Sequence, residues 1–296
     1  MSLDKIIENI ENNPDSIKAL NKERTEMIIK KAVNELSKDK TFLEKNGETA
    51  FIGDTHGDFD TTKKIFKEFK KRDFIIFLGD YVDREPMPWG SIYNINFLLS
   101  LKVKYPKKIF LLKGNHETNH VIPCFPHELK TEVKQKYGSI ELYEKYVHAF
   151  KEMPLMAYVN QSIFAAHGGI LKNYNKKELQ NIDKNEKDAL TKLVWSDPLE
   201  SPTFRGTGNP YGKDDLKDFL DNIDAKVFIK GHDPKTNGMS IYDDKCLTIF
   251  SSTRYKKMGN HGVLAATAKK PVNSVNDLNV WNLEKNQWNK YIVYKK

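Results

Sequence analysis

Short apolar runs recur along the chain, and a polar residue follows each of them closely. The runs lie at 50–52, 74–78, 109–112, 163–166, 227–229 and 247–250. Apolar stretches of this length that are bounded by glycine are typical of buried strands. The pattern therefore predicts six buried strands, three in each half of the chain.

Between these runs the apolar positions follow a helical spacing. Helices are predicted near 1–13, 14–40, 60–71 and 91–105, and as a pair within 128–151 that breaks at Gly138. Strand and helix alternate in the first half, which favours right-handed βαβ crossovers. Near the C-terminus, stretches at 278–283 and 288–294 flank a short polar turn and predict a hairpin.

The fold class that follows is α/β, with two packed sheets forming a central β-sandwich flanked by helices. The chain has 296 residues and shows no internal repeat or glycine-serine linker, so we expect a single domain over 1–296. Within it we expect N-terminal helices over 1–45, a core bearing the polar strand ends over 50–255, and the terminal hairpin within 275–296.

Composition predicts a soluble globular protein, since 39% of the residues are hydrophobic and 30% are charged. No apolar stretch approaches the roughly 18–20 residues that a membrane span needs, and the amphipathic N-terminus lacks secretory character. Two cysteines, Cys124 and Cys246, make no disulfide pattern and are expected to be structural. Their use favours a reducing compartment and predicts a cytoplasmic protein.

The formal net charge is +8, from 48 basic and 40 acidic side chains. One interpretation is attraction to an anionic partner such as RNA or a phosphorylated protein. Scattered surface lysines explain the same excess, and we favour them because the basic residues form only doublets and triplets. A nucleic-acid partner is not required by this pattern.

The polar residues that follow the apolar runs are metal-ligand types. Asp54 and His56 follow the first run, Asp80 the second and Asn115 the third, and the fourth and fifth reach imidazoles at positions 167 and 232. Ligands in sheets with helical connections gather where strands end, so these side chains are expected to share one rim. Nitrogen and oxygen donors without a thiolate suit Mn²⁺, Fe or Zn²⁺ better than Ca²⁺. Taken singly, such motifs also fit a turn capped by an aspartate or a surface ion pair.

The order of these motifs resembles the metal-dependent serine/threonine protein phosphatases of the phosphoprotein phosphatase family. The resemblance runs from about Ala50 to Tyr255. It rests on Gly-Asp-Thr-His-Gly (53–57), Gly-Asp-Tyr-Val-Asp-Arg (79–84), Gly-Asn-His-Glu (114–117), His-Gly-Gly (167–169), Trp-Ser-Asp-Pro (195–198), Arg-Gly (205–206), Gly-His (231–232) and Phe-Ser (250–251). It implies the calcineurin-like metallophosphoesterase fold and a phosphoric monoester hydrolase.

The resemblance also implies a role for each matching residue. The first metal would be held by Asp54 and His56, with Asp80 bridging both metals, and the second by Asn115, His167 and His232. The phosphoryl oxygens would be bound by Arg84, Arg205, Asn115 and Tyr255, and the leaving group would be protonated by His116, which Asp83 orients. The implied cofactors are two divalent cations, Mn²⁺ first, with Fe or Zn²⁺ as alternatives.

The implied reaction is the hydrolysis of phosphoserine and phosphothreonine on proteins. A hydroxide held between two cations exists near neutral pH and can attack phosphorus in line. Arginines neutralise charge on the phosphoryl oxygens, and a protonated imidazole assists the poor serine leaving group by roughly 10²–10⁴-fold. The expected partner is a phosphoprotein substrate; a regulatory subunit, if one docks, cannot be read from the sequence, and a monomer is the default expectation.

Several features depart from the family or leave alternatives open. Glu85 to Trp89 lengthen the loop after Arg84, and basic residues at 254, 256 and 257 suggest acidic or multiply phosphorylated substrates. His120 and His127 fit either substrate contact or, preferably, solvent exposure at the pocket rim. The enzymatic alternative is a dinucleoside-tetraphosphate hydrolase or another metallophosphoesterase acting on nucleotides or polynucleotides. The non-enzymatic alternative is a phosphate- or RNA-binding scaffold, which predicts gaps in the ligand set.

Overall fold

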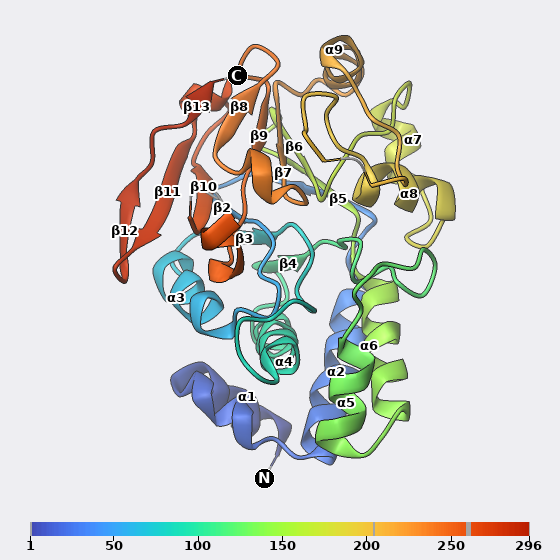
Figure 1. Cartoon of the computed structure of the whole chain (residues 1–296), viewed down its shortest axis with the longest axis vertical. Coiled ribbons are helices and arrows are strands. Elements are labelled where there is room, and N and C mark those ends of the chain that lie inside the picture. The colour runs from blue at the N-terminus through green and yellow to red at the C-terminus, as the bar shows by residue number, and fades with distance from the viewer. Residues whose placement is uncertain (1, 204, 259–261, 296) are drawn as a thin grey trace.

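Two β-sheets lie face to face in the computed structural model, which describes residues 2–203, 205–258 and 262–295. Helices cover the outer face of each sheet (Figure 1). The N- and C-termini lie at opposite ends of the molecule, with the N-terminal helices at one end and the sheets at the other. The predicted α/β fold with two packed sheets is confirmed.

The first sheet has six strands and contains the first three predicted runs. Its order is β12 (Gln287–Lys290), β11 (Asn279–Glu284), β10 (Leu264–Ala268), β2 (Thr49–Ile52), β3 (Phe74–Phe77) and β4 (Ile109–Leu111). The strands β2, β3 and β4 are parallel, because a helix connects each to the next, whereas β10 runs antiparallel to β2. The carboxyl ends of the three parallel strands therefore meet at one edge.

The second sheet has seven strands and contains the other three runs. Its order is β1 (Phe42–Lys45), β5 (Met156–Val159), β6 (Ile163–Ala166), β7 (Val227–Lys230), β9 (Cys246–Thr248), β8 (Met239–Ile241) and β13 (Tyr294–Lys295). Here β6, β7 and β9 are parallel neighbours. Their carboxyl ends also share an edge, and this edge faces that of the first sheet across the site described below.

The helices form two groups. On the side of the first sheet lie α1 (Leu3–Asn12), α2 (Lys22–Leu36), α3 (Phe59–Phe69), α4 (Gly90–Lys104), α5 (Leu129–Tyr137) and α6 (Glu141–Glu152), with the 3₁₀ helix η1 (Pro14–Ala19). In this group α4 packs against β4, and the other helices pack mainly against α4 or against one another. Against the second sheet lie α7 (Lys176–Gln180), α8 (Lys187–Trp195) and α9 (Lys213–Asn222). Short 3₁₀ helices occur at η2 (Pro234–Thr236), η3 (Thr253–Met258) and η4 (Val275–Asp277).

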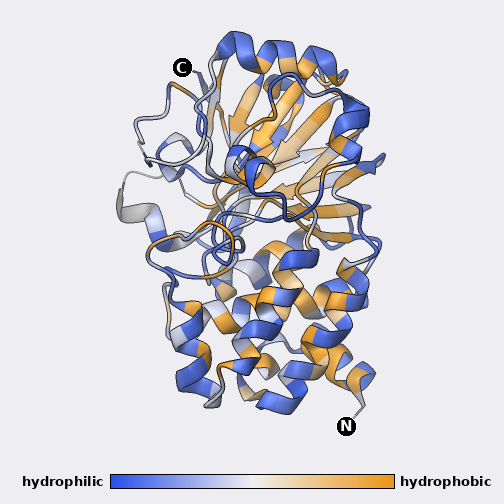
Figure 2. Cartoon of the chain, turned by 90° about the vertical axis from the view of Figure 1, so that its right-hand side faces the viewer, coloured by the Kyte–Doolittle hydropathy of each residue, from blue (hydrophilic) through white to orange (hydrophobic). Residues whose placement is uncertain are grey.

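Strand alternation divides the apolar core into three layers. In β2, Phe51 points between the sheets, whereas Ala50 and Ile52 point toward the helices. Both faces of the central strands are therefore buried, which is why their sequences are continuous apolar runs. Figure 2 shows apolar residues concentrated in the sheets and on the inner sides of the helices.

Local differences from the predicted elements have simple causes. Residues 42–45, expected among N-terminal helices, form strand β1 because they pair with β5. The helix expected over 14–40 begins as η1, and α2 starts only after Asn21, whose side chain accepts the backbone N–H of Arg24. The predicted break at Gly138 is confirmed, with that glycine in the left-handed region at φ 65°.

The predicted C-terminal hairpin is confirmed, but its second strand is shorter than expected. Strands β11 and β12 pair antiparallel, as the alternation predicts. After Tyr291, whose backbone N–H donates to the carbonyl of Val280 in β11, the chain leaves this sheet, and β13 joins β8 of the other sheet. No helix in the described part of the chain combines the length and apolarity of a membrane span.

Candidate metal centre

The five predicted motifs converge on one buried rim. Asp54 follows β2, Asp80 follows β3, and Asn115 with His116 follows β4, all from the first sheet. The second sheet contributes two imidazoles, which follow β6 and β7. All of the predicted metal ligands are at most 3% exposed: Asp54, His56, Asp80, Asn115, His167 and His232.

Asp80 occupies the middle of this group. Its Oδ2 atom lies 3.6 Å from His56 Nε2, 3.5 Å from His167 Nε2 and 3.9 Å from His116 Nε2. Asp80 Oδ2 therefore lies between the imidazole of His56 on one side and that of His167 on the other. This is the position that a ligand bridging two cations requires.

Two sets of donors lie on either side of Asp80. On one side, His56 Nε2 is 3.9 Å from Asp54 Oδ2. On the other, His167 Nε2 is 3.1 Å from both Asn115 Oδ1 and His232 Nδ1. Donor atoms from Asp80, His167 and His232 lie within 4.8 Å of one another, as do those of His56, Asp80 and His116. Such spacing fits ligands around shared cations.

Hydrogen bonds orient two of the imidazoles with Nε2 toward the centre. His56 Nδ1 lies 3.1 Å from the carbonyl of Val82, and His167 Nδ1 lies 3.0 Å from that of Leu78. Because a carbonyl only accepts, these Nδ1 atoms carry protons and leave Nε2 with a lone pair. In addition, the buried Nε2 atom of His116, which lies 3.9 Å from Asp80 Oδ2, lacks a hydrogen-bond partner among the described residues.

The backbone at the rim is held in an uncommon conformation. Positive φ angles occur at His56 (40°), Asp80 (55°), Asp83 (63°), Arg84 (60°) and His232 (71°). Left-handed non-glycine residues are uncommon, and they cluster at functional sites where the surrounding fold enforces them. The turns after the strands are therefore shaped for the site.

Two glycines allow the backbone to approach the carboxylates. A Cβ at Gly231 would lie 2.2 Å from Asp54 Oδ1, and one at Gly114 would lie 2.2 Å from Asp80 Oδ1. Any side chain at either position would displace a predicted ligand. This explains the glycine that precedes each of Asn115 and His232.

The electrostatics of the rim favour bound positive charge. Burial lowers the pKa of His56 to about 3 and that of His232 well below its usual range, so both imidazoles are neutral and able to act as ligands. Burial raises the pKa of Asp54 to about 7. Although burial disfavours an imidazolium, the carboxylates of Asp80 and Asp54 raise the pKa of His167 to about 9. Imidazole nitrogen and carboxylate oxygen donors without a thiolate fit a divalent transition metal.

The predicted phosphate-binding residues lie beside this rim. Arg84 Nη1 donates to the hydroxyl of Tyr255 over 3.2 Å. Arg205 donates from Nε to Asp197 (2.7 Å) and from Nη2 to the carbonyl of His232 (2.9 Å). Asp197, in the Trp-Ser-Asp-Pro turn, therefore anchors Arg205.

The predicted dyad is present at the same rim. His116 Nδ1 lies 2.6 Å from Asp83 Oδ2, and both side chains are buried. Its Nε2 atom points toward Asp80 rather than into the apolar core. His116 therefore has one nitrogen fixed by a carboxylate and the other at the centre of the site.

The structure adds a role for Glu117 and a partner for His127 that the sequence does not indicate. Glu117, fully buried, accepts the backbone N–H groups of Asp80, Tyr81 and Gly114, which fixes the turns after β3 and β4 together. His127 contacts Asp83 rather than solvent. Glu117 could have been suspected from its place in the Asn-His-Glu motif, whereas nothing in the local pattern indicates the partner of His127.

Comparison with known proteins agrees with this geometry. The calcineurin-like phosphoesterase family model matches residues 48–236. The "Probable serine/threonine-protein phosphatase" of Encephalitozoon cuniculi is 34% identical over 241 residues, covering 76% of this chain and 52% of that protein. Serine/threonine-protein phosphatase T of Trypanosoma brucei brucei is 32% identical, covering 73% and 48% respectively. The chain thus spans about half the length of these two relatives.

Two further proteins extend the comparison. A protein phosphatase 2A catalytic subunit of Dictyostelium discoideum is 30% identical over 226 residues, covering 71% of this chain and 70% of that protein. A solved serine/threonine phosphatase of Saccharomyces cerevisiae shares the fold, with a TM-score of 0.80, 23% identity and coverage of 96% of this chain and 97% of the other. The chain belongs to the calcineurin-like phosphoesterase family and, within it, to the phosphoprotein phosphatases.

Proposed function

We propose that the protein is a metal-dependent phosphatase that hydrolyses phosphoserine and phosphothreonine monoesters on proteins. The observation that carries this proposal is the convergence of a complete donor set, two arginines and an imidazole–carboxylate pair on one rim. The names of the relatives support a protein substrate. The scaffold alternative predicts gaps in this set, and the described residues have none.

We infer that Asp54, His56 and Asp80 hold one divalent cation and that Asp80, Asn115, His167 and His232 hold the second. When bound, the two cations supply Lewis-acid charge for the phosphoryl group and lower the pKa of water toward neutrality. Mn²⁺ is the first choice, and Fe or Zn²⁺ suit the same donors.

The phosphoryl oxygens are proposed to lie against four groups. Arg84 and Arg205 offer planar guanidinium forks that match phosphate geometry, and Asn115 and Tyr255 add neutral donors. Asp197 and the carbonyl of His232 hold Arg205, and Tyr255 contacts Arg84, so both guanidinium groups are positioned before substrate arrives. Preorganised charge of this kind stabilises the phosphoryl transition state.

His116 is proposed to donate a proton to the departing serine or threonine oxygen. Its Nδ1 is held by Asp83, so only Nε2 is available to the substrate. Burial opposes ionisation of Asp83, yet hydrogen bonds from His116 and His127 hold the pKa of that carboxyl well below its usual range. An ionised Asp83 stabilises the protonated imidazole that a general acid needs.

The proposed setting is the cytoplasm, because Cys124 and Cys246 are unpaired, buried thiols. Arg254 is exposed and precedes Tyr255 in the chain. We propose that its positive charge favours acidic substrates. The side chains of Lys256 and Lys257, part of the same hypothesis, lie outside those that the structure describes. Reversing the charge at position 254 tests it, because unchanged relative rates on acidic and neutral phosphopeptides would refute it.

Turnover of three substrates tests the proposed function. The Mn²⁺-loaded protein is expected to hydrolyse a phosphoserine peptide faster than a phosphotyrosine peptide or a dinucleoside tetraphosphate. Asp80→Asn and His116→Asn are expected to reduce that activity by about 10²-fold or more. Cleavage of the nucleotide alone would instead establish the alternative activity, and full activity in exhaustively chelated protein would end the metal-dependent assignment.

A further inference from the structure

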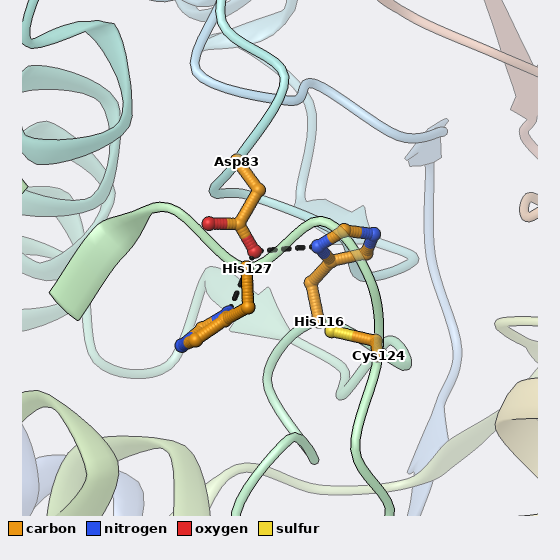
Figure 3. A group of neighbouring side chains, drawn as sticks. All are labelled: Asp83, His116, Cys124 and His127. Carbon is orange, nitrogen blue, oxygen red and sulfur yellow. Dashed lines mark hydrogen bonds and ion pairs between the residues drawn. The ribbon is translucent and has the colours of Figure 1, made fainter. Parts of the chain in front are cut away.

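The carboxylate of Asp83 accepts four hydrogen bonds. Its Oδ2 atom lies 2.6 Å from His116 Nδ1 and 2.8 Å from His127 Nδ1, so two imidazoles converge on one oxygen (Figure 3). Its Oδ1 atom accepts the backbone N–H groups of Glu128 (2.7 Å) and Leu129 (2.9 Å) at the start of α5. Asp83 is fully buried, and its acceptor sites are all used.

These contacts define the proton positions along a chain of four side chains. An ionised carboxylate only accepts, so Nδ1 of both imidazoles carries a proton. When the His127 ring is neutral, its Nε2 has a lone pair that accepts from the hydroxyl of Tyr143 at 2.9 Å. The tyrosine donates to His127, His127 donates to Asp83, and Asp83 holds His116.

The thiol of Cys124 lies close to Asp83, His116 and His127, so the four side chains could be taken for a metal site. Hydrogen bonds explain their arrangement better than a bound cation would. The two Nδ1–Oδ2 separations are hydrogen-bond lengths. Burial raises the pKa of Cys124 well above its usual range, so the sulfur remains protonated, and it faces Asn119 Oδ1 at 3.5 Å. A protonated thiol is a poor metal ligand.

We propose that His127 is a positioning residue for the leaving-group acid His116. The ring nitrogens of His127 are hydrogen-bonded to Asp83 and Tyr143. His127 fixes the second lone pair of Asp83 Oδ2, while α5 fixes Oδ1, and together they prevent the carboxylate from rotating away from His116. This inference rests on the proposed phosphatase activity, because only a leaving group that needs a proton depends on the orientation of His116.

The dependence on the leaving group separates positioning from a general structural role. A serine alkoxide needs a proton as it departs, whereas nitrophenolate is stable without one. Loss of His127 is therefore expected to slow a phosphoserine peptide by about 10-fold, and p-nitrophenyl phosphate by less than about 3-fold, because the whole acid contribution is only roughly 10²–10⁴-fold. A general loss of structure would slow both substrates equally.

Three variants of the metal-loaded full chain test the proposal. His127→Phe keeps a ring and removes both hydrogen bonds, and it is expected to show the unequal loss. His127→Asn keeps an N–H donor near the position of Nδ1 and is expected to recover most of the phosphoserine rate. Tyr143→Phe removes only the outer hydroxyl and is expected to lie between His127→Phe and the unchanged protein.

A measurement independent of turnover is proton NMR of the zinc-loaded protein. The Nδ1–H protons of His116 and His127 are each expected to give a downfield signal, in addition to those of His56 and His167, and His127→Phe should remove the signal of His127 and shift that of His116. Equal loss on both substrates, or a His116 signal that does not move, would overturn the role of His127. An unmodified protein that hydrolyses p-nitrophenyl phosphate but no phosphoserine peptide would overturn the proposed substrate instead, while the NMR comparison would still decide the role of His127.

Discussion

At the scale of single residues, the site depends on glycines as much as on ligands. We predict that Gly231→Ala lowers phosphatase activity by about 10²-fold, because misplacing reacting groups by about 1 Å has that effect. Its Cβ would lie 2.2 Å from Asp54 Oδ1, which also accepts the backbone N–H of His232 at 3.0 Å. Titration with Mn²⁺ is expected to show weaker binding, and circular dichroism an intact fold.

Gly212→Ala is the matched control for this change. A Cβ there meets Leu199 Cδ1 at 3.3 Å, a flexible side-chain end, and Gly212 has a φ of −94°, which alanine adopts readily. We expect metal affinity and activity to be retained in this variant. If Gly231→Ala also kept its metal affinity and its activity, the carboxylate of Asp54 would not lie against Gly231 as described.

The residues that could be predicted are those next to an apolar run. Asp54 and Asp80 lie two and three residues after the ends of β2 and β3, so strand prediction already placed them at one edge of a sheet. The partner of His127 could not be predicted, because it lies 44 residues away in the chain and the contact forms only when α5 packs beside the turn after β3. Local periodicity carries no information on such a pairing.

At the scale of elements, a buried lysine joins the end of α4 to its surroundings. Lys102 is fully buried, pairs with Asp39 at 2.7 Å, and donates to the carbonyls of Pro106 and Ile109. We predict that Lys102→Ala lowers the free energy of unfolding by about 3–5 kcal/mol, because Asp39 and the carbonyls lose their partner in a buried site. Urea denaturation measures this difference.

Lys104→Ala on the same helix is the control for Lys102→Ala. Lys104 is partly exposed and lies 3.6 Å from Glu11, and an exposed pair of this kind contributes at most about 1 kcal/mol. Equal destabilisation by the two variants would mean that the effect comes from helix propensity or lost side-chain packing and not from the buried pair.

Helix α5 carries a carboxyl whose environment predicts a dependence on pH. Burial and the Glu85 carboxylate raise the pKa of Glu132 well above its usual range. The folded protein thus favours the protonated form, and this contribution to stability is complete below the unfolded pKa of about 4.3 and declines as pH rises. Glu132→Gln is expected to stabilise the protein by about 1–3 kcal/mol at pH 8 and to have little effect near pH 4.

Urea midpoints at the two pH values measure the effect of Glu132→Gln. Glu68→Gln, at an exposed position on α3, is the control and is expected to change the free energy of unfolding by less than about 0.5 kcal/mol at both. A Glu132→Gln effect of the same size at pH 4 and pH 8 would exclude ionisation as its cause.

Helices and strands were predicted well where the apolar spacing continues over several residues. They were predicted poorly where a segment is a strand only because it pairs with another strand. The apolar spacing in α3, α4, α5 and α6 indicated helices within a few residues of their bounds. By contrast, residues 42–45 and 294–295 are strands only because they pair with β5 and β8, so their own sequences contain little signal.

At the scale of the whole molecule, the candidate metal centre joins the two sheets. Asp54, Asp80 and Asn115 come from the first sheet, and His167 and His232 from the second. Direct hydrogen bonds already cross this rim, among them those from Ser251 N to the Asp54 carbonyl at 2.9 Å and from His232 N to Asp54 Oδ1 at 3.0 Å. Cations bound between the sheets would further stabilise the packing of one sheet against the other.

Metal addition is accordingly predicted to raise the thermal midpoint of unfolding. A ligand at 100 times its dissociation constant stabilises the folded state by about 2.7 kcal/mol for each site. For a chain of 296 residues that corresponds to an increase of about 4 °C for each site, or about 9 °C for two. His232→Gln, which removes a ligand from the second sheet, is expected to lose a large part of the Mn²⁺-dependent increase. Arg84→Ala is expected to keep the increase while slowing hydrolysis, because Arg84 binds phosphate and not metal in this assignment. If His232→Gln kept the full increase, the cations would not join the two sheets through that residue.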